Sequence, residues 1–184
     1  MFIKGKNISL EAINDRFLGH IQEWGNNGEI TKTMTTGMKP NGGVLYSSWD
    51  SVEEEFERYK KSKNDVIFGI FLLEPEHCLI GITGLYNIQW VPRNAELRII
   101  IGEEDVLGKG YGTEAVLLLV EYGFDKLNLH RIYLGCNASD ERANKCYLKS
   151  GFVLEGTFRD NSFRNGRYYD ANRYAIINKK EGKK

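Results

Sequence analysis

Apolar positions in the first third of the chain predict a strand followed by helices. Residues 2–10 read as a strand, and residues 12–24 repeat apolar side chains at close to helical spacing. Residues 25–48 are rich in Gly, Thr and Asn, which predicts a long loop with room for a short turn of helix. In residues 51–61, Ser and Glu have capping-box spacing, and we expect a helix there.

Denser apolar segments follow and predict an antiparallel meander of three strands. The strands span residues 66–73, 78–90 and 95–101. Glu74–His77 and Pro92–Asn94 have the composition of the turns between them. Gly81 and Gly84 indicate a bulge or bend in the second strand.

The second half of the chain alternates helices and strands. We expect helices over 112–126 and from Asp140 or Glu141 to Ser150, and strands over 131–137, 152–159 and 168–177. Gly151 is typical of a residue that ends a helix, and Asn165-Gly166 separates the last two strands. A meander joined to a strand–helix–strand crossover predicts an α+β fold with a mixed sheet.

A glycine loop between an apolar strand and an apolar helix is the strongest local feature. Gly108, Gly110 and Gly112 let backbone N–H groups approach a ligand without interference from Cβ atoms. The helix after them adds unpaired amide donors and the positive end of its dipole. This combination predicts an anion site, and phosphate is the usual anion at such a site.

Two familiar phosphate-binding loops do not fit this stretch. A Walker loop needs a glycine where this chain has Glu103, and Ser or Thr after Gly108-Lys109 where it has Gly110. A dinucleotide loop needs its third glycine one residue later, and it lies near the start of its domain.

The length of 184 residues and the composition predict one ordinary globular domain over residues 1–178, followed by a charged tail over residues 179–184. Lys plus Arg and Asp plus Glu balance at 25 each, so the net charge gives no reason to expect a nucleic-acid partner. The chain lacks an apolar segment long enough to span a membrane and a signal-peptide core, so we expect no membrane partner. Three cysteines without metal-site spacing favour a reducing cytoplasm and no metal.

Two segments resemble signatures of the GNAT acetyltransferases. Gly110 and Gly112 match the small positions of the pattern Arg/Gln-x-x-Gly-x-Gly/Ala, while Leu107 stands where Arg or Gln is usual. The second pattern is Asn-x-x-Ala-x-x-x-Tyr-x-Lys-x-Gly-Phe, in which Asp140 replaces the first Asn. Its matching residues are Ala143, Tyr147, Lys149, Gly151 and Phe152.

Further matching pieces place the resemblance nearest the branch of spermidine and ribosomal-protein N-terminal acetyltransferases. They span residues 93–97, 127–132, 155–159 and 165–170, so that the likeness covers roughly residues 95–177. The resemblance implies a GNAT fold, in which helices flank a mixed, mostly antiparallel central sheet.

The resemblance implies an N-acetyltransferase that uses acetyl-CoA, with direct attack by a primary amine in one ternary complex. An ammonium of pKa about 10.4 must lose a proton first, which costs about 4.6 kcal/mol at pH 7. The acceptor stays open between a polyamine, an amino sugar or aminoglycoside, and a protein N-terminus. A polyamine pocket needs many carboxylates, which Glu53–Glu57 supply if their helix faces the site. A coenzyme-A-binding sensor or scaffold without turnover is the alternative, and a homodimer through edge strands is also open.

The resemblance assigns Tyr147 as the general acid toward sulfur, against the alternative of a core aromatic. Glu96 is the candidate base or ammonium anchor, against the alternative of a structural carboxylate near Arg98; strand alternation puts both on one face. Asn137 or Asn144 would compensate for Asp140, whose carboxylate accepts but does not donate hydrogen bonds. The expected coenzyme-binding residues are Ile99, Ile100, Ile101, Leu107, Gly108, Lys109, Gly110, Tyr111, Gly112, Thr113, Asn137, Asp140, Asn144, Tyr147 and Lys149.

Overall fold

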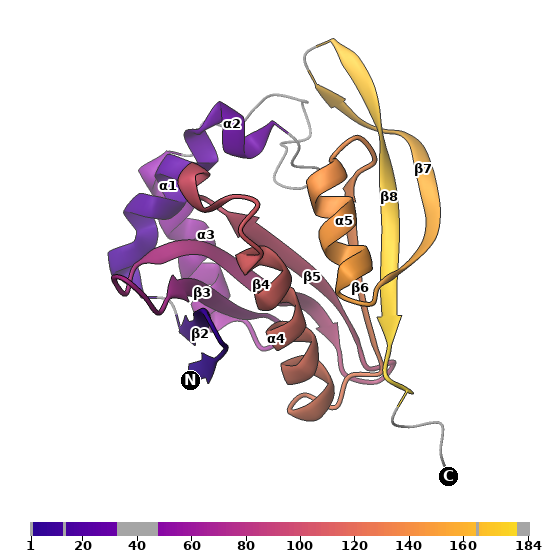
Figure 1. Cartoon of the computed structure of the whole chain (residues 1–184), viewed down its shortest axis with the longest axis horizontal. Helices are drawn as coiled ribbons and strands as arrows, with labels where there is room; N and C mark the ends of the chain where they lie inside the picture. The colour runs from indigo at the N-terminus through magenta and orange to yellow at the C-terminus, as the bar shows by residue number, and fades with distance from the viewer. Residues whose placement is uncertain (1, 13, 33–47, 165, 180–184) are drawn as a thin grey trace.

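The computed structural model describes residues 2–12, 14–32, 48–164 and 166–179, and these form one mixed sheet with helices on both faces (Figure 1). The sheet has eight strands in the order β1-β2-β3-β4-β5-β6-β8-β7. Their bounds are β1 Phe2–Lys4, β2 Ile8–Ala12, β3 Val66–Leu72, β4 Leu79–Gln89, β5 Asn94–Ile101, β6 Arg131–Asn137, β7 Val153–Arg164 and β8 Arg167–Ile177. Neighbours are antiparallel except β5 and β6, which are parallel. The α+β class with a mostly antiparallel sheet is therefore confirmed.

The helices divide into two groups. The first group is η1 Asp15–Phe17, α1 Leu18–Asn26, α2 Gly28–Thr31 and α3 Trp49–Lys61, and the second is η2 Glu104–Val106, α4 Tyr111–Asp125 and α5 Glu141–Lys149. Helices α4 and α5 lie on the opposite side of the sheet from α1, α2 and α3 (Figure 1). Each group covers its own hydrophobic core, the larger one under α4 and the smaller one around Trp24 and Ile30.

The sheet opens between β5 and β6. These strands pair only where residues 94–96 meet residues 131–133. Beyond Glu96, β5 continues to Ile101 and β6 continues to Asn137 with no pairing to each other. The backbone edges that face this gap have no partner strand, so their N–H and C=O groups are available to a ligand.

One of the bends predicted in β4 is present and has a steric cause. The pairing register of β3 and β4 shifts between Ile70 and Phe71, opposite Gly81. A Cβ atom on Gly81 would lie 2.3 Å from the carbonyl oxygen of Ile100. Glycine therefore allows β5 to approach β4 closely at the point where β5 borders the gap.

The predicted elements need correction at four places. Residues 2–10 form two strands rather than one, because the chain turns at Gly5, whose N–H donates to the carbonyl oxygen of Ile8 at 2.8 Å. Residues 12–24 contain η1 and then α1, which runs on to Asn26. Helix α3 begins at Trp49 rather than Ser51, because Ser48 caps it and accepts from the Ser51 N–H at 3.1 Å.

Strand β7 is the fourth correction, since it runs to Arg164 and not to Arg159. Its pairing with β8 continues beyond a register shift between Phe158 and Ser162. Because this extension depends on the partner strand, the local sequence pattern does not reveal it. The loop predicted over 25–48 contains α2, and its residues 33–47 lie outside the described part, as do Asn165 and residues 180–184 of the predicted tail.

Candidate active site

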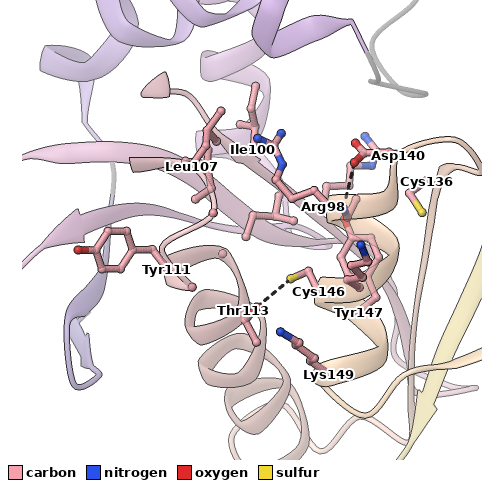
Figure 2. A pocket seen from close by; sticks show the side chains of 18 of the residues that line it. Arg98, Ile100, Leu107, Tyr111, Thr113, Cys136, Asp140, Cys146, Tyr147 and Lys149 are labelled. Carbon is pink, nitrogen blue, oxygen red and sulfur yellow. Dashed lines mark hydrogen bonds between the residues drawn. The ribbon is translucent and has the colours of Figure 1, made fainter. Parts of the chain in front are cut away.

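A cavity of about 560 Å³ occupies the opening between β5 and β6 (Figure 2). Strand β5, the loop before α4, the first turn of α4, the end of β6 and one face of α5 supply its walls. The cavity therefore lies where the sheet has unpaired backbone and where a helix begins.

The first turn of α4 presents free amide donors to this cavity. Gly108 and Gly110 have φ of +77° and +93°, in the left-handed region that favours glycine. Gly110 is the N-cap residue of α4. Because glycine has no side chain, it cannot accept hydrogen bonds from the amides of residues 111–113 as a capping side chain would. A Cβ placed on either glycine meets no atom within 4 Å, so the space in front of the loop is open. These donors and the helix dipole suit a phosphate group.

The two faces of β5 belong to different halves of the cavity. Leu97, Ile99 and Ile101 pack with the core under α4. Ile100 packs with the other core, and Arg98 lies on the same side of the strand, turned away from Thr113 and Lys149 (Figure 2). The Arg98 Nη2 donates to Glu96 Oε2 at 2.7 Å, which confirms that these two side chains share a face.

Tyr147 projects from α5 into the cavity wall and is buried. Its ring lies against Phe152 and Tyr174, with centroids 6.2 and 6.0 Å away. Burial raises the pKa of the Tyr147 phenol above its ordinary value, so the hydroxyl keeps its proton at neutral pH.

Asp140 and the two asparagines that were expected to assist it build the start of α5. Asp140 Oδ1 caps the helix by accepting from the Ala143 N–H at 3.0 Å. The Asn144 amide donates to the carbonyl oxygens of Asn137 and Asp140 at 3.1 and 2.7 Å, and its Oδ1 accepts from the Tyr174 hydroxyl at 2.6 Å. Asn137 and Asn144 therefore hold β6, α5 and β8 together, and they are absent from the described lining of the cavity.

The structure brings most of the other predicted residues to the cavity. The predicted residues that line it are Glu96, Ile99, Ile100, Ile101, Leu107, Gly108, Gly110, Tyr111, Gly112, Thr113, Asp140, Tyr147 and Lys149. Lys109 is exposed and does not belong to that lining.

Sequence reasoning missed a basic stripe on α5. Arg142 and Lys145 line the cavity together with Lys149. Their spacing of three and four residues places them on one helix face, a signal that was present in the sequence. The stripe suits a further phosphate group. Cys146 was also missed; it receives a 3.4 Å hydrogen bond from the Thr113 hydroxyl, which joins α5 to α4 (Figure 2).

Within residues 2–12, 14–32, 48–164 and 166–179, no group of three or more His, Cys, Asp and Glu side chains is placed to hold a metal ion. None of the helices in those ranges is long and apolar enough to cross a membrane.

Comparison with known proteins gives a consistent assignment. Residues 9–153 match the model of the Acetyltransferase (GNAT) domain. A spermidine N(1)-acetyltransferase of Vibrio cholerae is 37% identical over 136 residues, which cover 73% of this chain and 76% of that protein. A ribosomal-protein-serine acetyltransferase of Escherichia coli is 29% identical over 59% of this chain and 60% of its own length.

A solved structure supports the same family assignment. The Vibrio cholerae spermidine N-acetyltransferase in complex with CoA and spermine superposes with a TM-score of 0.83 at 30% identity, covering 94% of this chain and 96% of that chain. The chain belongs to the GNAT acetyltransferase family, and its fold is the GNAT fold. It is an N-acetyltransferase by this relationship, and a non-catalytic module is not favoured.

Proposed function

We propose that this protein transfers the acetyl group of acetyl-CoA to a primary amine by direct attack in a ternary complex. The observation that carries the proposal is the gap between β5 and β6. It joins the uncapped amides of α4 on one face of the sheet to the Glu96–Arg98 pair on the other. When bound, acetyl-CoA supplies a thioester that the unpaired edge of β5 can hold in that gap.

The donor set fits the coenzyme. Amides at the start of α4 bind the pyrophosphate, and the basic face of α5 attracts the remaining phosphate. Leu107 lines the cavity, and because the amides are backbone groups, its replacement of Arg or Gln leaves them in place. The backbone of residues 99–101 binds the pantetheine arm and polarises the acetyl carbonyl.

Two side chains move the protons. Glu96 is buried and takes the proton of the ammonium or anchors it, while its ion pair with Arg98 fixes the carboxylate. Tyr147 keeps its proton at neutral pH and donates it to the sulfur as charge develops there.

The class of amine that accepts the acetyl group is not determined by the transfer chemistry. The relatives include a spermidine N(1)-acetyltransferase and a ribosomal-protein-serine acetyltransferase, so a polyamine and a protein amine are both candidate acceptors. The acidic run of α3 does not supply a polyamine pocket in the described residues. Glu53 and Glu54 are exposed, Glu55 accepts from Tyr59 at 2.6 Å, and Glu57 pairs with Lys60; none of them lines the cavity.

Thermal melting with acetyl-CoA, followed by a thiol-release assay on a panel of amines, tests the proposal. Acetyl-CoA at about 100 times its dissociation constant should add about 2.7 kcal/mol to the free energy of unfolding. Thiol release that depends on an added amine supports acetyl transfer. A melting shift without amine-dependent release would favour a sensor or scaffold, and no shift at all would refute the coenzyme site.

We also propose a cytoplasmic location, which the free thiols of Cys78, Cys136 and Cys146 support because such thiols persist in a reducing compartment. A homodimer stays an alternative to the monomer, and sedimentation equilibrium decides between them.

A further inference from the structure

Arg98 is a cation in the acceptor half of the cavity. It projects from the face of β5 that is turned away from the α4 amides and lines the cavity beside Glu96. Its guanidinium lies over the ring of Tyr86, 4.8 Å from the ring centroid. The side chain is 37% exposed, so part of the guanidinium remains accessible to a ligand.

The guanidinium has unused hydrogen-bonding capacity. Glu96 is its ion-pair partner among the described residues, through Nη2. The Arg98 Nε–H is buried and has no acceptor within the described part of the chain. An arginine offers five N–H donors in a planar fork that matches the two oxygens of a carboxylate. A buried donor without an acceptor costs about 1–3 kcal/mol. Because the Nε–H is enclosed, an anionic ligand would meet the N–H donors of the terminal nitrogens in the exposed part of the guanidinium.

The charge on this face of β5 is therefore balanced rather than acidic. Glu96 contributes one negative charge and Arg98 one positive charge, and Ile30, Ile100 and Leu107, which line the cavity and pack together on this side of β5, are apolar. A polyamine carries several positive charges, and the Arg98 guanidinium repels each charge that approaches it. An acceptor with one ammonium and one adjacent anion complements the pair.

We propose that the acceptor is a primary amine that carries a carboxylate close to its nitrogen, as a free α-amino acid does. The inference rests on the proposed acetyl transfer and narrows its substrate class. Glu96 meets the ammonium and Arg98 meets the carboxylate. Since the two side chains are in contact at 2.7 Å, the two groups of the acceptor must also be close together.

The reaction that follows is balanced. The ammonium gives one proton to Glu96, and the neutral nitrogen bonds to the acetyl carbon as the carbon–sulfur bond breaks. Tyr147 gives its proton to the departing sulfur, which leaves as a thiol, and the second proton of the nitrogen passes through solvent to the Tyr147 phenolate. Glu96 then releases the first proton to solvent, so that both side chains return to their starting states. The carboxylate of the acceptor takes no part in the chemistry and serves for recognition by Arg98.

A matched series of acceptors tests the substrate class. Leucine has the carboxylate, leucinamide replaces it with a neutral amide, 3-methylbutylamine lacks it, and spermidine is the polycation. Thiol release is measured for each acceptor, and kcat/KM is corrected for the fraction of neutral amine. We expect leucine to exceed the two analogues that lack a carboxylate by about 10- to 100-fold, as the loss of one charged hydrogen-bonded group predicts. Spermidine should be poorer than leucine.

Substitution of Arg98 separates recognition from support of the fold. Arg98→Gln and Arg98→Met should each reduce the preference for leucine over 3-methylbutylamine to within about threefold, while Arg98→Lys retains part of it. The melting shift with acetyl-CoA should not change in these variants. Arg16→Gln removes an exposed arginine of η1 outside the cavity lining and should keep the full preference.

Two results would overturn the inference in different ways. Amine-dependent transfer in which leucinamide or spermidine matches leucine, or in which Arg98→Gln keeps the preference, refutes the carboxylate-bearing acceptor and leaves the acetyl transfer standing. Absence of both the melting shift and transfer to every amine refutes the proposed function together with the inference.

Discussion

Tyr147 and Tyr174 are neighbouring tyrosines with different surroundings. Their ring centroids lie 6.0 Å apart. The Tyr174 hydroxyl donates to Asn144 Oδ1 at 2.6 Å, whereas the structure gives the Tyr147 hydroxyl no acceptor among the described residues. Removing one oxygen from each ring therefore separates a role in chemistry from a role in stability.

Tyr147→Phe should lower kcat by about 100-fold or more, the usual effect of losing a general acid. The melting shift with acetyl-CoA should persist, because the ring and its packing remain. Tyr174→Phe is the control; it should cost about 1 kcal/mol of stability through the lost hydrogen bond and keep most of the turnover. Steady-state kinetics and thermal melting measure both effects. Wild-type kcat in Tyr147→Phe would refute the assignment of the acid.

At the scale of single elements, the glycine before α4 has two functions: it adopts a left-handed backbone conformation, and it leaves space for a ligand in front of the helix. Gly110 has φ of +93° and Gly166, in the β7–β8 turn, has φ of +75°, and added Cβ atoms meet nothing at either position. The two glycines thus share the left-handed conformation, in which a residue with a Cβ would be strained, and they differ in position, since Gly110 lines the cavity and Gly166 does not.

Gly110→Ala and Gly166→Ala should each destabilise the fold by about 1–2 kcal/mol, the cost of the left-handed conformation for a residue with a Cβ. Gly110→Ala should in addition lower the affinity for acetyl-CoA by at least about tenfold, because the methyl group of the alanine enters the space in front of the α4 amides. Calorimetric titration measures the affinity. Equal affinities of the two variants would show that the coenzyme does not approach this loop.

The same elements show what the sequence predicts and what it does not. The predicted bounds of β6, residues 131–137, agree with the structure, and those of α4 and α5 agree within one or two residues, because periodicity and capping are local signals. Arg98 and Arg142 were missed as cavity residues, since neither stands at a fixed position of the family signatures. The extension of β7 depends on pairing with β8, which no local pattern encodes.

At the scale of the whole molecule, one carboxylate joins the N-terminal hairpin to the helix that borders the cavity. Glu114 of α4 accepts from the backbone N–H groups of Lys6 and Asn7 at 2.6 and 2.8 Å and from the Asn7 side chain at 2.8 Å. A Cβ on Gly5 would lie 2.4 Å from Glu114 Oε1, so the turn fits closely around the carboxylate. The contact spans more than 100 residues of sequence and was not predicted.

This contact makes stability depend on pH in a defined direction. Partial burial favours the neutral acid, but the donors of Asn7 and Lys6 outweigh it, and the pKa of Glu114 lies below its usual 4.5. The ionised carboxylate therefore stabilises the fold fully above pH 4.5, and this stabilisation is lost as the pH falls through the lower pKa of the folded state. Glu114→Gln removes the charge and with it the dependence on protonation.

Glu114→Gln should lower the free energy of unfolding at pH 7 by about 1–2 kcal/mol, because hydrogen bonds to a charged acceptor become hydrogen bonds to a neutral one. The difference from the wild-type protein should shrink as the pH falls through the lowered pKa of Glu114, because the wild-type carboxylate also becomes neutral there. Glu121→Gln, at an exposed position of the same helix, should follow the wild-type curve throughout. Urea denaturation at a series of pH values measures all three curves. Suppose instead that the free energies of unfolding of Glu114→Gln and the wild type differ by the same amount at every pH. The glutamine would then destabilise the fold for steric reasons, and the charge of Glu114 would not hold the hairpin to the helix beneath the active site.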